Sequence, residues 1–515
     1  MKRLPARLVA LPLWASVIAA AVGGIVLGAA FPTLSLWPLA FAGVFIILWS
    51  LNGRTWASGL LIGLVSGAMF WGPLIHWLTL YLGPVPWLGL AGVQTVYFVI
   101  FGAVAAVVLR HGPTVWSTTR KRLIFIPLVL AGLWVAREGI AAVWPYGGFA
   151  WGRLAQSQSE SGFGPLVAWC GTAGLSFLIA WSAAFVFEAI RVRRFLRVGA
   201  ITILVLVCAV AFPRFPVATS GTIRLAAVQG NTKSALFDVV EPGQNVIDHA
   251  ETTLTYVKSP VDVVIWPENA SDVDPTRFKE SAQVLDYLSA KYNAPFIVGT
   301  ITEPRDGVYF NSSLVWMSGQ GVTAQYDKIH PVPFAEYMPN RDFFHALAPD
   351  LVDMVTHDYS FGTRSNVVQV AGTNIGLSIC FDIVDDQQIF DMLSSGANII
   401  VAQTNNADFG YSEESAQQLA IARLRAIETG RTLVNISTVG ISSIIGPDGQ
   451  TIDSLPEHTR GAMTNTLNLS SSTTPAMVIG RGIEWLLGAI GLVGFALCSF
   501  ASRRLGRGRG EREGN

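Results

Sequence analysis

The chain has 515 residues, of which 51% are hydrophobic and 14% are charged. Soluble proteins carry roughly 25% charged residues, so this composition excludes an ordinary soluble protein and indicates that much of the chain lies in a membrane. The formal net charge is +0, which argues against nucleic acid as a partner.

Eight apolar runs follow one another along the chain, and each predicts a membrane-spanning helix. A helix needs about 20 apolar residues to cross a hydrocarbon core of about 30 Å. The runs lie near residues 8–30, 34–51, 56–80, 88–110, 122–143, 164–188, 197–212 and 482–501. We therefore expect a membrane domain of seven transmembrane helices over residues 1–212, and a last transmembrane helix with a basic cytoplasmic tail over residues 482–515.

Lysine and arginine are concentrated in alternate connections between these runs. They lie before the first run, at Arg54, between residues 110 and 122, between residues 191 and 197, and after residue 502. Segments of this kind stay on the cytoplasmic side of a membrane. Seven crossings from a cytoplasmic N-terminus then place residues 213–481 outside, so we expect this domain to be extracytoplasmic.

Residues 213–481 have the pattern of a globular α/β domain. Short runs rich in β-branched residues alternate with helical segments and turns. The segment 414–429 has apolar residues at helical spacing, which predicts an amphipathic helix. Of the four cysteines, only Cys380 lies in this region, so no disulfide can form within it. No phosphate-binding loop or zinc-ligand cluster stands out, and we expect neither a cofactor nor a metal.

Three reactive side chains follow predicted strands in this domain. Glu268 comes after the run 263–266, Cys380 comes after the run 376–379, and Lys328 lies between them in the chain. A thiol with a pKa of about 8.5 needs a base to take its proton and a cation to favour the thiolate. Glu268 is the candidate base, and Lys328 is the candidate donor to the oxyanion of a tetrahedral intermediate. Taken singly, the three residues could equally be a helix cap, a core side chain and a surface charge.

The motifs around these residues, in this order, resemble those of the nitrilase superfamily over most of the globular domain. The matching segments are Trp266-Pro267-Glu268, Tyr326-Asp327-Lys328 and Ile379-Cys380-Phe381-Asp382. That superfamily uses a Glu-Lys-Cys triad on a four-layer α-β-β-α sandwich. The resemblance therefore implies that Glu268, Lys328 and Cys380 are the catalytic residues.

A nitrilase-like domain between several membrane helices and one final helix is similar to the bacterial apolipoprotein N-acyltransferases. The segment 330–339 resembles the loop that follows the lysine in that family, and the resemblance covers essentially the whole chain. It implies that Glu336 supports Lys328 and the tetrahedral intermediate, the alternative being a carboxylate on a surface loop. The expected fold is a membrane α-helical bundle of about eight transmembrane helices plus an α/β nitrilase-like sandwich.

The resemblance also implies a reaction and its substrates. Cys380 would take an acyl chain from a phospholipid as a thioester and pass it to the N-terminal diacylglyceryl cysteine of an apolipoprotein. The partners would be these two substrates and membrane lipid, without a cofactor or metal. The expected location is the bacterial cytoplasmic (inner) membrane, as a multi-pass protein with a periplasmic catalytic domain.

Two other functions use the same sequence features. A membrane-tethered nitrilase-type amidase or hydrolase would use the triad with water as the acceptor, although seven preceding helices exceed what a tether needs. A second alternative is a scaffold for a membrane glycosyltransferase, as occurs in some high-GC Gram-positive relatives. Three positions also depart from the acyltransferase pattern, in ways that bear on the shape of the substrate pocket: Phe381, Asp382 and Asp408.

Overall fold

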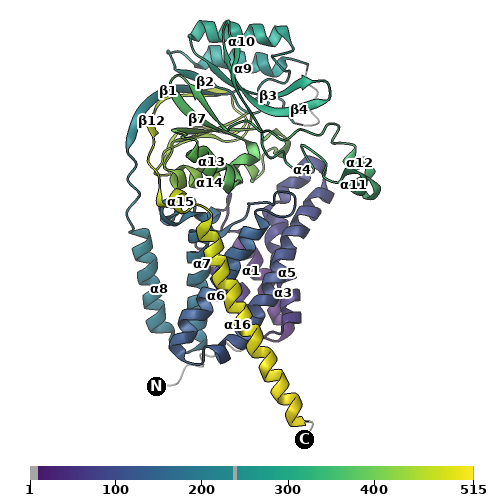
Figure 1. The fold of residues 1–515 in the computed structure, drawn as a ribbon, viewed down its shortest axis with the longest axis vertical. Coiled ribbons are helices and arrows are strands. Elements are labelled where there is room, and N and C mark those ends of the chain that lie inside the picture. The colour runs from purple at the N-terminus through teal and green to yellow at the C-terminus, as the bar shows by residue number, and fades with distance from the viewer. Residues whose placement is uncertain (1–9, 236–240, 514–515) are drawn as a thin grey trace. The chain divides into compact units, whose positions relative to one another are not determined.

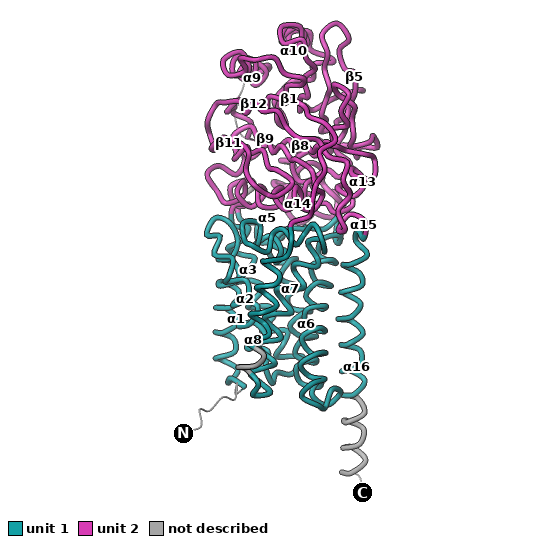
Figure 2. The backbone as a smooth tube through the Cα atoms, turned by 90° about the vertical axis from the view of Figure 1, so that its left-hand side faces the viewer, with its two compact units in different colours: residues 1–76, 84–213, 479–515 teal, residues 77–83, 214–478 magenta. Residues whose placement is uncertain are grey.

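The computed structural model describes residues 10–235 and 241–513 and forms two compact units. Unit 1 holds the described residues up to 76, residues 84–213 and those from 479 onward, whereas unit 2 holds residues 77–83 and 214–478. Figure 2 colours the two units separately. The short segment 77–83 therefore belongs to the second unit, although the chain on both sides of it belongs to the first.

Unit 1 is a bundle of apolar helices (Figure 1). Its helices are α1 (Leu13–Gly28), α2 (Leu39–Ser50), α3 (Trp56–Leu74), α5 (Pro84–Val115), α6 (Thr119–Ala141), α7 (Val167–Arg191), α8 (Phe195–Val210) and α16 (Gly482–Glu513). Within residues 10–235 and 241–513, five helical stretches can each cross a membrane by length and composition, including Gly164–Arg191 and Gly482–Ser502, while α1, α2 and the 199–210 part of α8 are shorter. Each of the eight expected runs thus contains a helix, and the protein is a multi-pass membrane protein. The start of the first run, residues 8–9, and the basic residues before it lie outside the described residues.

Close contact between these helices depends on glycine. A side chain at Gly63 of α3 would collide with the backbone of α5 at Phe98, and one at Gly132 of α6 would collide with the backbone of α16 at Leu487. Small residues let membrane helices approach closely when lipid offers no hydrophobic driving force for association. The third expected run, 56–80, ends earlier as a spanning helix, because α3 stops at Leu74 and the chain continues into a 3-10 turn.

Unit 2 contains two six-stranded sheets. The first has, in spatial order, β12 (Gly461–Ser470), β1 (Thr219–Gln229), β2 (Val263–Ile265), β3 (Phe296–Arg305), β4 (Val308–Met317) and β5 (Gly321–Asp327). The second has β11 (Thr451–Leu455), β10 (Ser442–Ile445), β9 (Leu433–Ser437), β8 (Ile399–Thr404), β7 (Thr373–Ile379) and β6 (Val367–Val370). The helices and 3-10 turns of this unit are η1 (His76–Leu78, which begins in unit 1), α4 (Thr79–Leu82), α9 (Gln244–Tyr256), α10 (Lys279–Tyr292), α11 (Arg341–Leu347), α12 (Pro349–Val352), η4 (Cys380–Val384), α13 (Asp386–Ser394), η5 (Ala407–Phe409), α14 (Glu414–Thr429) and α15 (Pro475–Ile479).

The two sheets pack face to face, with helices on their outer faces. Successive side chains of a strand point to opposite faces, so Val263 and Ile265 enter the core between the sheets while Val264 packs toward α9 and α10. Helices α13 and α14 cover the other sheet at β7, β9 and β10 (Figure 1). These layers confirm the expected α-β-β-α sandwich.

Strand directions bring several strand ends to one edge of the first sheet. β2 runs parallel to β3, and β4 is antiparallel to both β3 and β5. β5 therefore runs in the same direction as β2, so the residues that follow β2 and β5 emerge at the same edge. Glu268 and Lys328 are among them.

Candidate active site

Glu268 lies in a buried turn after β2, and its side chain is 4% exposed. Its Oε1 accepts a hydrogen bond of 2.8 Å from Nδ2 of Asn311, which lies on β4. Pro267 precedes it in the chain and has no N–H to continue the sheet ladder. The carboxylate is therefore held within the protein rather than in solvent.

Lys328 and Glu336 form an ion pair at the end of β5. The Lys328 side chain is 1% exposed, and its Nζ lies 2.8 Å from Oε2 of Glu336. The same Oε2 accepts a 2.6 Å hydrogen bond from the backbone N–H of Val332, which closes the loop that carries Glu336. The structure thus brings Glu336 to Lys328, and neither side chain is a solvated surface charge.

Asn311 joins the two carboxylates, and sequence reasoning missed it. Its Nδ2 donates to Oε1 of Glu268 at 2.8 Å and to Oε1 of Glu336 at 2.7 Å. The backbone N–H of Lys328 also donates to the backbone carbonyl of Asn311 at 2.8 Å. A single buried amide thus ties Glu268, Glu336 and the Lys328 backbone into one network.

Cys380 occupies the first position after β7, in the turn that begins η4. Its φ of 51° is unusual for a residue with a side chain. Strained backbone of this kind is concentrated at functional sites. Asp382 holds the turn, because its carboxylate accepts hydrogen bonds from the Ile379 N–H at 3.0 Å and from the Tyr326 hydroxyl at 2.8 Å. Asp382 therefore fastens the Cys380 turn to β5.

The electrostatics of the site suit proton transfer near neutral pH. Burial is the main reason that the pKa of Glu268 rises to about 7, with Glu336 adding to the rise and Lys328 opposing it. Burial and the charge of Glu268 raise the pKa of the Cys380 thiol well above its ordinary value, against the opposing effect of Lys328. Cys380 is therefore a thiol at rest, and a pKa of about 7 allows Glu268 to accept a proton near neutral pH.

Lys328 remains an ammonium group in this setting. Burial lowers its pKa, but the negative charge of Glu336 and, when they are ionised, those of Cys380 and Glu268 outweigh that effect, so its pKa lies above the ordinary value for lysine. A fixed positive charge in a buried site can stabilise a negative charge that develops during a reaction.

A further buried carboxylate, Glu414, lies at the start of α14. Its Oε2 accepts a 2.6 Å hydrogen bond from Nδ2 of Asn406, and burial is the main cause that raises its pKa to about 8. Its charge also raises the pKa of Cys380. The sequence showed this residue only as the first member of an amphipathic helix, with nothing to mark it as part of the site.

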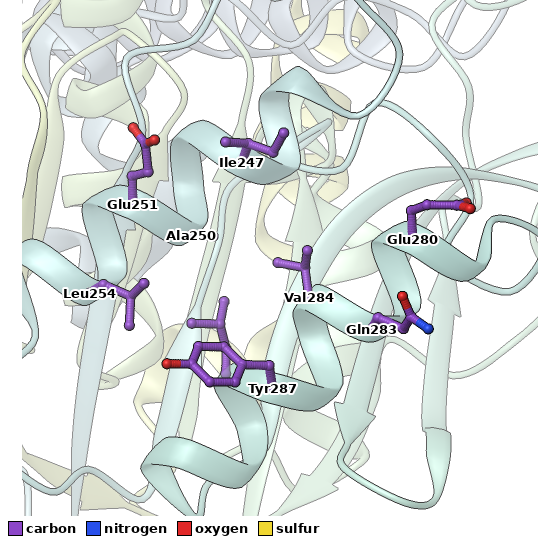
Figure 3. A pocket seen from close by; sticks show the side chains of 9 residues that line it. Ile247, Ala250, Glu251, Leu254, Glu280, Gln283, Val284 and Tyr287 are labelled. Carbon is purple, nitrogen blue, oxygen red and sulfur yellow. The ribbon is translucent and has the colours of Figure 1, made fainter.

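A separate groove of about 500 Å³ lies between α9 and α10 (Figure 3). Its walls are mostly apolar and include Leu254, Val284 and Tyr287. None of the triad residues lines it. Across residues 10–235 and 241–513, no group of three or more His, Cys, Asp or Glu side chains is placed to hold a metal ion.

Two family models match the chain. One, described as carbon-nitrogen hydrolase, matches residues 224–474, and the other, described as apolipoprotein N-acyltransferase N-terminal domain, matches residues 23–185. The first range includes Glu268, Lys328 and Cys380. The second covers most of the membrane helices before α8.

Individual proteins are similar to the chain over most of its length. An apolipoprotein N-acyltransferase of Mycolicibacterium smegmatis is 31% identical over 91% of this chain and 82% of its own length. One of Vibrio cholerae is 26% identical over 90% of this chain and 93% of its own length. Among solved structures, an amidase from Nesterenkonia sp. aligns with 50% of this chain and 94% of its own, at 15% identity and a TM-score of 0.38.

Proposed function

Because this chain belongs to the apolipoprotein N-acyltransferase family, we propose that it moves an acyl chain from a phospholipid to the N-terminal amine of a diacylglyceryl apolipoprotein, through a thioester on Cys380. The observation that carries the proposal is the buried network in which Asn311 links Glu268 to the Lys328–Glu336 ion pair. It supplies a base and a cation to a thiol that needs both.

The first half-reaction forms the thioester. Glu268 takes the proton of the Cys380 thiol, and the sulfur attacks the carbonyl carbon of the phospholipid ester. Lys328 stabilises the resulting oxyanion, a contribution worth roughly 3 to 4 kcal/mol for one well-placed donor. The carbon–oxygen bond then breaks, the glycerol oxygen takes the proton from Glu268, and lysophospholipid leaves.

The second half-reaction discharges the thioester. The nitrogen of the acceptor amine attacks the same carbonyl carbon, and Glu268 takes a proton from that nitrogen. The carbon–sulfur bond breaks, and the sulfur recovers the proton from Glu268. Burial of Glu268 and Lys328 helps to exclude water, which would otherwise hydrolyse the thioester.

Glu336 has a supporting role in this proposal. It neutralises part of the Lys328 charge between turnovers and fixes the ammonium group at 2.8 Å. Through Asn311 it also shares a hydrogen-bond donor with Glu268. A lysine held on both its backbone and its side chain needs little reorganisation when the oxyanion forms.

We further propose that residues 213–481 face the extracytoplasmic side of the bacterial inner membrane. The alternation of basic and basic-poor connections supports this orientation. Both substrates carry acyl chains that anchor them in a lipid bilayer, so a multi-pass enzyme can meet them there. The names of the matched relatives give no support to a glycosyltransferase partner, and we do not propose one.

A thioester assay tests the proposal. After incubation with phospholipid and no acceptor, mass spectrometry should find one acyl group on the peptide that contains Cys380, and neutral hydroxylamine should remove it. Cys208→Ala is the matched control, because Cys208 is exposed on α8, and it should keep the adduct. An adduct that persists in Cys380→Ala would refute the assigned nucleophile.

A further inference from the structure

Residues 77–83 are a part of unit 2 that comes from the membrane-domain sequence. They comprise the end of η1 and all of α4, and the chain continues on one side into α3 and on the other into α5. Figure 2 shows this segment in the colour of unit 2. The catalytic unit therefore includes a segment from far upstream in the chain.

Aromatic contacts hold this segment against η5. The rings of Trp77 and Phe409 lie 5.0 Å apart at an angle of 80°, and the ring of Tyr81 lies 6.2 Å from that of Phe409. The Trp77 indole N–H also donates a 3.2 Å hydrogen bond to Oε1 of Gln417 on α14. Phe409 thus contacts both Trp77 and Tyr81.

The Tyr81 side chain lies close to the network that holds Lys328. Burial raises the pKa of its hydroxyl, and the negative charges of Asp408 and Glu336 raise it further, so the hydroxyl keeps its proton. Tyr81 also lies near Tyr359, whose backbone N–H donates to the Glu336 carbonyl at 2.7 Å. The Tyr81 hydroxyl makes no hydrogen bond to any of the described residues (10–235 and 241–513). A protonated donor beside the triad network is therefore available to a ligand.

The surroundings of this donor indicate what kind of ligand it meets. Leu80, the preceding residue, is 56% exposed, and the apolar ring of Phe409 lies 6.2 Å from that of Tyr81. A tyrosine in such a place offers an apolar ring and one polar tip. That combination suits a carboxylic ester joined to a hydrocarbon chain, in which a few oxygen atoms interrupt an otherwise apolar surface.

We propose that residues 77–83 form one wall of the acyl-donor site, and that the Tyr81 hydroxyl donates a hydrogen bond to an ester oxygen of the phospholipid. The proposal rests on the proposed function, because it needs a phospholipid donor. Tyr81 touches the substrate in this account, while Trp77 and Phe409 position it. The acceptor also carries glyceryl esters, so the two half-reactions must be measured separately.

The test compares Tyr81→Phe with Tyr287→Phe in the full-length protein. Tyr287 is 57% exposed and lines the groove between α9 and α10, away from the triad, so the control removes a hydroxyl without touching the site. Removing one hydrogen bond should slow thioester formation at subsaturating phospholipid by about threefold to tenfold. The rate at which a diacylglyceryl peptide discharges the preformed thioester should stay unchanged, and so should the melting temperature.

Three results would overturn the proposal. Equal rates in Tyr81→Phe and Tyr287→Phe would mean that the hydroxyl makes no contact with the donor. Slowing confined to the discharge step would assign the contact to the acceptor. A lowered melting temperature with an unchanged donor half-saturation concentration would make Tyr81 structural. If the parent protein itself forms no thioester, the proposed function fails. The same assay therefore distinguishes that failure from a failure of the Tyr81 proposal alone.

Discussion

The amide of Asn311 offers the most detailed prediction. Asn311→Leu keeps nearly the same side-chain volume in a buried position but removes both hydrogen bonds, at 2.8 Å to Glu268 and at 2.7 Å to Glu336. The backbone hydrogen bond from Lys328 to residue 311 does not involve the side chain. The strand should therefore form as before, with two carboxylates left without their shared donor.

The size of the effect follows from these two hydrogen bonds. A hydrogen bond to a charged group contributes roughly 1.5 to 3 kcal/mol. If the loss of one is felt fully in the transition state, thioester formation should slow by about 10-fold to 100-fold, since about 1.4 kcal/mol corresponds to a factor of ten. A decrease in the rate of thioester formation within this range would show that Asn311 affects the reaction more than an ordinary polar residue in a strand does.

The pH dependence should change as well, in a defined direction. The donor from Asn311 lowers the pKa of Glu268, which burial raises to about 7. Without that donor the pKa rises further, so a smaller fraction of Glu268 is an ionised base at pH 7. The acidic limb of the rate profile should therefore move to higher pH.

The assay is single-turnover thioester formation measured across the neutral pH range. Asn465→Leu is a matched control, because Asn465 lies on β12 and donates a 2.6 Å hydrogen bond to Oδ2 of Asp453. Loss of this hydrogen bond should leave the rate of thioester formation and the acidic limb of the pH profile the same as in the parent. The reasoning is refuted if Asn311→Leu and Asn465→Leu give the same profile.

Three further predictions concern other parts of the molecule. Lys328→Met should remain folded, by melting temperature in detergent, and should lose nearly all acyl transfer, since the lysine supplies charge to the oxyanion; activity within a few-fold of the parent would contradict that role. Burial raises the pKa of Glu414 from 4.5 to about 8, so the stability linked to this group is lost as pH rises through that window. The melting temperature of Glu414→Gln minus that of the parent should therefore increase as the pH rises from 5 to 8. A difference that stays constant over this range would argue against the raised pKa of Glu414. In intact cells, an impermeant thiol reagent should label Ser220→Cys but not Arg507→Cys, and the reverse pattern would overturn the orientation.

Much of the fold was predictable because its signals are local. Long apolar runs predicted the helices of unit 1, and short β-branched runs predicted the strands of unit 2. Residues 77–83 were placed wrongly, partly in the third spanning helix. The segment lies within a continuous apolar run of the sequence, whereas the structure places Trp77 against Phe409 and Gln417, both distant in sequence.

The candidate site was predictable only where a motif marked it. Glu268, Lys328, Glu336 and Cys380 each lie in a recognisable segment, and the structure places all four in or beside one buried network. Asn311 carries no such mark, because a polar residue within a strand is usually solvent-facing. Its role depends on the register of β4 against β3 and β5, which the sequence does not display.

The most direct test of the central claim follows the acyl group from donor to acceptor. The acylated enzyme is separated from phospholipid and mixed with a diacylglyceryl peptide that has a free N-terminal amine. The account predicts that the acyl mass leaves the Cys380 peptide and appears as an amide on the acceptor in equal amount. Release of free fatty acid with the acceptor unchanged would contradict it and favour a hydrolase.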